Sequence, residues 1–150
     1  MRPIWRSVGT LVLAGTMAIV GTAAAQTPPP APANAGDLAV TVTYKGAGEV
    51  KASNEISIFL FDTPTINAES QPIGMQTIEK NGGVANFTNL PATVYIAVVF
   101  DEKGVYDQQG PPPTGTPLAI HSEKNGPSLP VSTGKGAKVS ITFDDTIRMP

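Results

Sequence analysis

The sequence contains no cysteine, which limits both how the chain is stabilised and which sites it can build. No disulfide can form, so a folded domain must rely on its apolar core. Zinc sites usually rest on cysteine and histidine, and here only His121 and carboxylates could serve as ligands. A lipid-modified N-terminal cysteine is excluded as well. For an exported chain, this composition fits a bacterial protein better than a eukaryotic growth factor or toxin.

Basic residues are also few, and they form no cluster. Ten Lys and Arg stand against twelve Asp and Glu, a formal net charge of −2. Neutralising several phosphates requires Lys or Arg gathered on one face, so we do not expect a nucleic-acid partner. The same scarcity argues against binding to anionic lipid. We therefore expect no membrane association once the N-terminal segment described next has been removed.

The N-terminal segment has the composition of an export signal. Arg2 and Arg6 precede an uncharged apolar stretch, and Ala23 and Ala25 stand at the small-residue positions of a cleavage site. This pattern predicts a signal peptide at residues 1–25, which directs the chain to the periplasm or outside the cell. A retained membrane anchor is the alternative, but several Gly and Thr in the stretch weaken it.

The residues after the predicted signal peptide are rich in proline and alanine. The segment QTPPPAPANAG, residues 26–36, has too few apolar side chains to bury a core and favours an extended polyproline form. We expect a flexible linker there. The folded domain is predicted to span residues 37–147.

Amphipathic helical patterns are absent from the domain. Apolar and polar residues instead alternate with a period of two, which is typical of strands with one buried face. In the first such run, Leu38, Val40, Val42 and Tyr44 share one face. We expect strands at residues 38–44, 55–62, 72–80, 84–90, 93–101 and 137–143, with 55–62 and 93–101 in central positions.

Glycine and proline, 15 residues each, mark the turns between these strands. Asn81-Gly82 is typical of a hairpin turn because both residues tolerate positive φ, so residues 84–90 are expected to return beside 72–80. Three consecutive prolines cannot contribute to a sheet ladder, which makes residues 102–117 a long surface loop. Short strands separated by turns predict an antiparallel β-sandwich.

Residues 84–104, VANFTNLPATVYIAVVFDEKG, resemble the F-x-x-L-P-x-G-x-Y strand pair of transthyretin-like domains. This family includes prealbumin-like and carboxypeptidase regulatory-like modules and small exported bacterial domains. Phe87, Leu90, Pro91 and Tyr95 occupy the matching positions, although the usual glycine is missing from the turn. The resemblance implies an all-β, seven-stranded antiparallel sandwich of the immunoglobulin-like or transthyretin-like kind. It also implies a domain without catalytic residues.

The acidic stretch DEKGVYD, residues 101–107, is the main candidate for a metal site. Asp101, Glu102 and Asp107 supply carboxylate oxygens, which calcium prefers as ligands. The EF-hand pattern fails because a lysine and a valine occupy ligand positions, so only a looser site remains, to which Asp144 and Asp145 could add ligands. The alternative interpretation is that Asp101 caps a turn of its own backbone. No other cofactor is expected.

The single histidine gives little support for catalysis. His121 precedes Ser122 and Glu123, but adjacent residues of an extended chain point in opposite directions, and no G-x-S-x-G motif is present. Copper binding through His121, Met75 and Met149 is chemically conceivable, but the three are distant in sequence, and Met75 is expected in the core. We assign no catalytic residues and do not expect an enzyme.

Aromatic residues are too few for a carbohydrate platform. The only tryptophan, Trp5, lies in the predicted signal peptide, and Tyr44 and Tyr95 are expected in or beside the core. Tyr106 remains as a potential anchor for a protein partner. Its neighbours Pro111, Pro112 and Pro113 would reduce the entropy lost when the loop binds.

The sequence therefore predicts a non-enzymatic, periplasmic or secreted β-sandwich. Its expected role is to bind a protein partner through the loop at residues 104–117. The alternative is a metal-binding module, stabilised by calcium at residues 101–107.

Overall fold

The structure is a computed structural model that describes residues 36–123 and 126–150. The predicted signal peptide lies outside these residues, as does the predicted linker except for Gly36, which begins the first strand. None of the described residues forms a helix long and apolar enough to cross a membrane. The strands are β1 (Gly36–Tyr44), β2 (Ile56–Phe61), β3 (Gly74–Ile78), β4 (Val84–Leu90), β5 (Thr93–Phe100), β6 (Leu118–Ile120), β7 (Val131–Ser132) and β8 (Lys138–Phe143).

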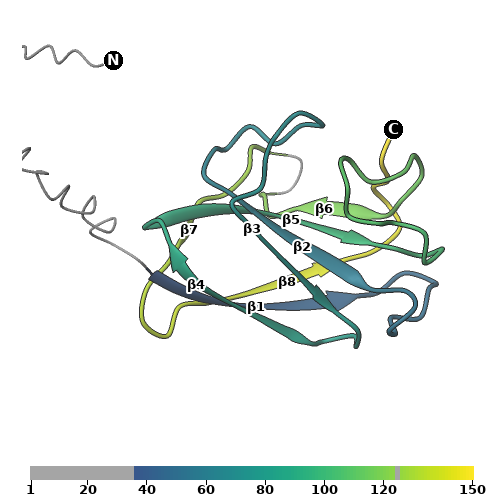
Figure 1. Ribbon diagram of the computed structural model, residues 1–150, viewed down its shortest axis with the longest axis horizontal. Helices are drawn as coiled ribbons and strands as arrows, with labels where there is room; N and C mark the ends of the chain where they lie inside the picture. The colour runs from purple at the N-terminus through teal and green to yellow at the C-terminus, as the bar shows by residue number, and fades with distance from the viewer. Residues whose placement is uncertain (1–35, 124–125) are drawn as a thin grey trace, which may run out of the picture.

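The strands form two sheets that enclose the core (Figure 1). The smaller sheet has the order β4-β1-β8, and the larger has the order β3-β2-β5-β6, with β7 paired to the start of β5. The predicted all-β sandwich is confirmed. The structure has eight strands, against the six segments predicted from the pattern and the seven strands implied by the resemblance. The two strands beyond the six are β6 and β7, which form between residues 118 and 132, where none was expected.

One strand pair departs from the predicted antiparallel arrangement. β8 runs parallel to β1, in register from Ala39 opposite Lys138 to Tyr44 opposite Phe143. The cause lies in the preceding loop, where the Gly134 N–H donates to the Asp37 carbonyl at 2.9 Å. This bond brings the chain to the beginning of β1, so β8 has to run in the same direction as β1.

The core between the sheets is aliphatic and aromatic, as the period-two pattern predicted. The face of β1 that carries Leu38, Val40, Val42 and Tyr44 is buried. It packs against inward residues of the larger sheet, because alternate residues of a strand share one face. Those residues are Ile56, Ile58 and Leu60 of β2 and Val94, Ile96, Val98 and Phe100 of β5.

The outer face of the larger sheet is apolar too. Phe59 and Phe61 of β2 form a second buried cluster with Ala97 and Val99 of β5, and Ile66 and Tyr106 from two loops pack against it. The prediction that β2 and β5 are central is therefore confirmed, and the structure shows that both strands carry buried residues on both faces. Met75, expected in the core, is instead 40% exposed, because β3 is an edge strand and Met75 pairs with Phe59 of β2, whose side chain is on the outer face of the sheet.

The Asn81-Gly82 turn forms, but it does not build a hairpin. Gly82 adopts a φ of 75°, as expected, yet β3 and β4 lie in different sheets. The Asn81 side chain accepts a hydrogen bond from the Tyr44 N–H and donates one to the Tyr44 carbonyl, both at 2.8 Å. The Gly82 N–H donates to the Val42 carbonyl. These bonds direct the chain across to β1, so β4 pairs with β1 rather than with β3.

The segment that carries the family resemblance also crosses between sheets. Phe87 and Leu90 are buried, as predicted, and Pro91 connects β4 to β5. The two strands do not pair with each other, since β4 belongs to the smaller sheet and β5 to the larger. Tyr95 lies on the outer face of β5, half-buried beside the second cluster.

Replacing Ile96 by alanine tests the central position of β5. Ile96 is fully buried between the sheets. Its truncation should leave a cavity and lower the free energy of unfolding by about 2–5 kcal/mol. Val84→Ala, at a half-exposed site, should change it by less than about 0.5 kcal/mol. Urea unfolding monitored by circular dichroism measures both values, and equal effects of the two changes would contradict the assigned core.

Candidate functional site

The acidic stretch begins where β5 ends, at the open end of the sandwich. Asp101 turns back onto its own loop, accepting hydrogen bonds from the Val105 N–H at 3.1 Å and the Tyr106 N–H at 2.8 Å. Gly104 makes the turn possible with a φ of 64°. The interpretation of Asp101 as a turn cap is therefore confirmed.

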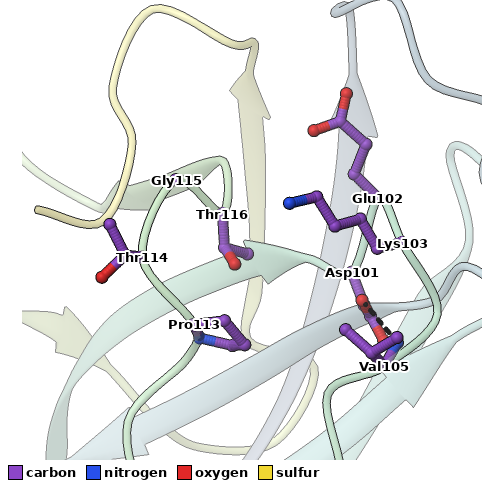
Figure 2. A pocket seen from close by; sticks show the side chains of 8 residues that line it. All are labelled: Asp101, Glu102, Lys103, Val105, Pro113, Thr114, Gly115 and Thr116. Atoms are coloured by element: carbon purple, nitrogen blue, oxygen red, sulfur yellow. Dashed lines mark hydrogen bonds between the residues drawn. The ribbon is translucent and has the colours of Figure 1, made fainter.

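The other two predicted calcium ligands make separate contacts. Glu102 accepts a hydrogen bond from the Arg148 guanidinium at 2.9 Å, and Asp107 accepts one from the Gln109 N–H at 2.9 Å. Figure 2 shows the side chains of Asp101 and Glu102 pointing in opposite directions. Across the described residues, no three or more His, Cys, Asp or Glu side chains gather closely enough to hold a metal ion. The structure thus does not bring Asp101, Glu102 and Asp107 together as a ligand set.

Arg148 organises this end of the molecule, and the sequence contained no sign of it. Its guanidinium lies 2.9 Å from Glu102 and 3.7 Å from Asp145 and donates a hydrogen bond to the Gly115 carbonyl at 2.7 Å. Each ion pair is partly exposed, so solvent screens it and it stabilises the fold little by itself. Together they connect the acidic stretch, the long loop and the end of β8. The positive charge occupies the space between Glu102 and Asp145, where a shared cation would have to bind.

Tyr44 adds a buried aromatic group to the same network. Its ring packs on Phe100 and Phe143, with centroids 4.4 and 5.1 Å away, and its hydroxyl donates to the Asp145 carboxylate. Burial, followed by the hydrogen bond and charge of Asp145, raises the pKa of Tyr44 well above its usual value. The same hydrogen bond is the main cause of a lowered pKa at Asp145. The pair therefore favours a neutral phenol beside an ionised carboxylate.

The long loop after Asp101 is held at several points. Tyr106, predicted to anchor a partner, instead turns toward the sheet, where its ring lies 6.4 Å from that of Phe59. Its hydroxyl donates to the Gly110 carbonyl at 2.8 Å, and burial raises its pKa. Val105 is 66% exposed, the largest exposure among the exposed large apolar residues of the described chain. Pro111 and Pro113 are exposed as well, and Pro112 is half-buried.

The C-terminal residues fasten the far end of this loop. The Gly115 N–H donates to the Met149 carbonyl, and the Met149 N–H donates to the Thr116 carbonyl, both at 2.9 Å. The Leu118 N–H donates to the Ile147 carbonyl at 3.0 Å. The folded domain therefore includes Met149, two residues beyond the predicted end at 147.

Two hollows flank the acidic stretch. The first, between residues 101–105 and 113–116, is seen in Figure 2 and has a volume of about 20 Å³, enough for one or two water molecules. The second lies on the other side of the stretch and has a volume of about 280 Å³. It falls just below the range that suits drug-sized ligands. Its lining residues are Ala52, Ser53, Glu55, Ser57, Asp101, Gly104, Tyr106 and Gln108.

The remaining candidate ligands and catalytic residues are not assembled. His121 follows β6, and none of the side-chain hydrogen bonds in the described residues joins it to Ser122 or Glu123. Met75 lies on β3, at the opposite edge of the larger sheet from β6. Three strand spacings of about 4.8 Å separate these edges, too far for Met75 and His121 to share one copper ion.

A comparison of the chain with protein-family models, with curated proteins and with solved structures finds no match. The resemblance to transthyretin-like domains thus stays a prediction based on Phe87, Leu90, Pro91 and Tyr95.

Calcium should leave the thermal stability of this protein unchanged. The three carboxylates at residues 101–107 diverge and already accept hydrogen bonds from the chain, whereas calcium requires six or more oxygens around one point. A ligand that binds only the folded state raises the unfolding midpoint. Melting curves with and without about 1 mM calcium should coincide. A midpoint several degrees higher with calcium would support the metal-binding alternative.

Tyr44 should make the protein lose stability at alkaline pH. In the unfolded chain the phenol ionises near pH 10, whereas the folded chain retains the proton to higher pH because the pKa of Tyr44 is raised. The resulting stabilisation is complete below the unfolded pKa and is lost as pH rises above it. Urea unfolding between about pH 8 and about pH 11 should show a shallower decline for Tyr44→Phe. Tyr106 is present in both proteins, so parallel declines would refute the role of Tyr44.

Proposed function

We propose that the chain is an exported, non-enzymatic interaction module that contacts a protein partner through the loop at residues 104–117. The N-terminal sequence supports the exported location, with Arg2 and Arg6 before an uncharged stretch and Ala23 and Ala25 at its end. The absence of a nucleophile–base arrangement around His121 in the described residues supports a binding role over catalysis.

The observation that carries the proposal is the combination of exposure and attachment in the loop. Val105, Pro111 and Pro113 face solvent, while Asp101, Tyr106 and the C-terminal residues hold the loop in place. A loop that is already ordered loses less entropy when it binds a partner. Long ordered loops in compact domains are often functional.

The structure changes the role that Tyr106 has in this proposal. The ring packs on the second apolar cluster and the hydroxyl is bonded within the loop, so Tyr106 supports the contact surface from beneath. The partner would then meet Val105 and the prolines, with Lys103 and Asp107 as charged neighbours. A surface of this kind fits a partner that offers a shallow apolar patch with a polar rim.

A triple variant tests this contact surface. Val105→Ser, Pro111→Ser and Pro113→Ser together remove the exposed apolar groups but keep Asp101, Tyr106 and the C-terminal attachments. The purified chain, immobilised and exposed to an extract of its host, should capture a defined partner, and the variant should bind that purified partner at least about tenfold more weakly. Surface plasmon resonance measures the affinities.

The matched control is Val84→Ser, which removes an exposed apolar side chain from the smaller sheet. It should leave the affinity unchanged. If the triple variant binds every captured protein as well as the native chain does, the loop is not the contact surface. Equal losses in the variant and the control would point to a general effect on folding, which circular dichroism would reveal.

A further inference from the structure

The second hollow contains the one buried polar side chain of the described core. Ser57 is 2% exposed and lines the hollow from β2. Its side chain lies on the outer face of the sheet, which it shares with Phe59, because its neighbours Ile56 and Ile58 point into the core. This is also the face against which Tyr106 packs.

The Ser57 hydroxyl is available to a ligand. The side-chain hydrogen bonds of the described residues do not include it, and those residues contain no fully enclosed polar side-chain atom without a partner. Ser57 lines the hollow, so the small exposed part of this residue borders that space. A buried hydroxyl is costly unless it forms a hydrogen bond, so this position favours a ligand or solvent molecule that donates to it or accepts from it.

Two negative charges border the same space. Glu55 and Asp101 both line the hollow, and the Asp101 N–H donates to the Glu55 carbonyl at 2.9 Å, which holds the two residues side by side. The ion pairs of the described residues include neither carboxylate. Asp101 is capped by neutral N–H groups, which leave its negative charge in place.

The walls of the hollow are formed before any ligand binds. The Asn54 side chain donates to the Glu102 carbonyl at 2.7 Å, which ties residues 52–55 to the acidic stretch. Gly104 approaches the Ser53 carbonyl so closely that any side chain there would overlap it. Tyr106 contributes an aromatic residue to the lining. Such a site needs little rearrangement on binding.

We propose that this hollow binds the ammonium group of a small organic amine or of a lysine side chain. Glu55 and Asp101 supply the charge, the Ser57 hydroxyl accepts a hydrogen bond, and the Tyr106 ring favours a cation by its quadrupole. A metal ion lacks sufficient ligands there, and an anion would meet two carboxylates. The volume of about 280 Å³ admits an amine with a short alkyl chain. This site is separate from the exposed prolines of the proposed protein contact.

The test is a titration of the isotope-labelled full-length chain, followed by amide chemical shifts, with three ligands of similar size. Butylammonium chloride, butanol and sodium butyrate differ mainly in the charge and hydrogen bonding of the head group. Butylammonium should shift the amides of Glu55, Ser57 and Gln108 with saturation, with a dissociation constant of roughly 1–10 mM. Butanol should bind at least about tenfold more weakly, and butyrate should not bind.

Variants identify the groups responsible. Glu55→Gln should weaken butylammonium binding about three- to tenfold, since it removes one of the two charges. Ser57→Ala should also weaken butylammonium binding. This change removes none of the side-chain hydrogen bonds found in the described residues. Glu69→Gln makes the same charge change on an exposed loop and should have no effect beyond salt screening. Thermal unfolding checks that each variant is folded.

A second arm separates the two sources of the ammonium group. Lysine acetylated at its α-amino group and converted to the N-methylamide presents the same ammonium group on a peptide backbone. Affinity equal to or greater than that of butylammonium assigns the site to lysine side chains, and weaker binding assigns it to free amines. Equal binding of butanol and butylammonium, or unchanged binding by a folded Glu55→Gln variant, would overturn the proposal. The variant with Val105→Ser, Pro111→Ser and Pro113→Ser should still bind butylammonium. Failure of the protein-contact proposal can therefore be distinguished from failure of the ammonium-site proposal.

Discussion

The burial of β2 and β5 on both faces is the constraint on which the rest of the structure depends. A chain without cysteine has to obtain its stability from apolar packing, and these two strands place side chains in the core and in a second cluster on the outer face. Burial of apolar surface contributes about 25 cal/mol per Å². Because the outer face is itself apolar, loops have to cover it. Tyr106 and Ile66 do so, which fixes where those loops run.

The open end of the sandwich is built from strand ends that are distant in sequence. Tyr44 ends β1, Phe100 ends β5 and Phe143 ends β8, and their rings pack together. The parallel pairing of β8 with β1 is what places Asp145 beside the Tyr44 hydroxyl. Arg148 then reaches Glu102 from the following residues. The polar network is thus a consequence of strand direction, and it orders the C-terminal residues.

Most of the strands could be predicted from the sequence because burial alternates along them. The inward residues of β1 and the two covered faces of β2 and β5 follow from hydrophobic pattern alone. Strand pairing could not be derived in this way. Gly82 has the positive φ expected of a hairpin turn, but Asn81 does not. The bonds from Asn81 to Tyr44 connect residues 37 positions apart, and they decide which sheet β4 joins.

The candidate site could be predicted from the sequence even less well, because most of its contacts join residues that are distant in the chain. The capping role of Asp101 was predictable, since its partners lie four and five residues away. The roles of Arg148 and Ser57 depend on tertiary contacts. A single arginine near the C-terminus has no pattern around it, and a serine between two isoleucines is indistinguishable from any solvent-facing residue of a strand. In the folded chain Ser57 is buried, and Gly104, Tyr106 and Gln108 of the long loop line the same hollow.

Structural and binding roles are compatible at Asp101 because of the kind of donor that caps it. Two backbone N–H groups donate to its oxygens and are themselves neutral, so its negative charge is not balanced. A lysine or arginine partner would have balanced that charge with a positive one. Glu102, one residue later, is paired with Arg148 and contributes little net charge to its surroundings. The acidic stretch is therefore divided by function. Glu102 holds the C-terminal residues, and Asp101 shapes the loop while leaving a negative potential in the hollow beside Ser57.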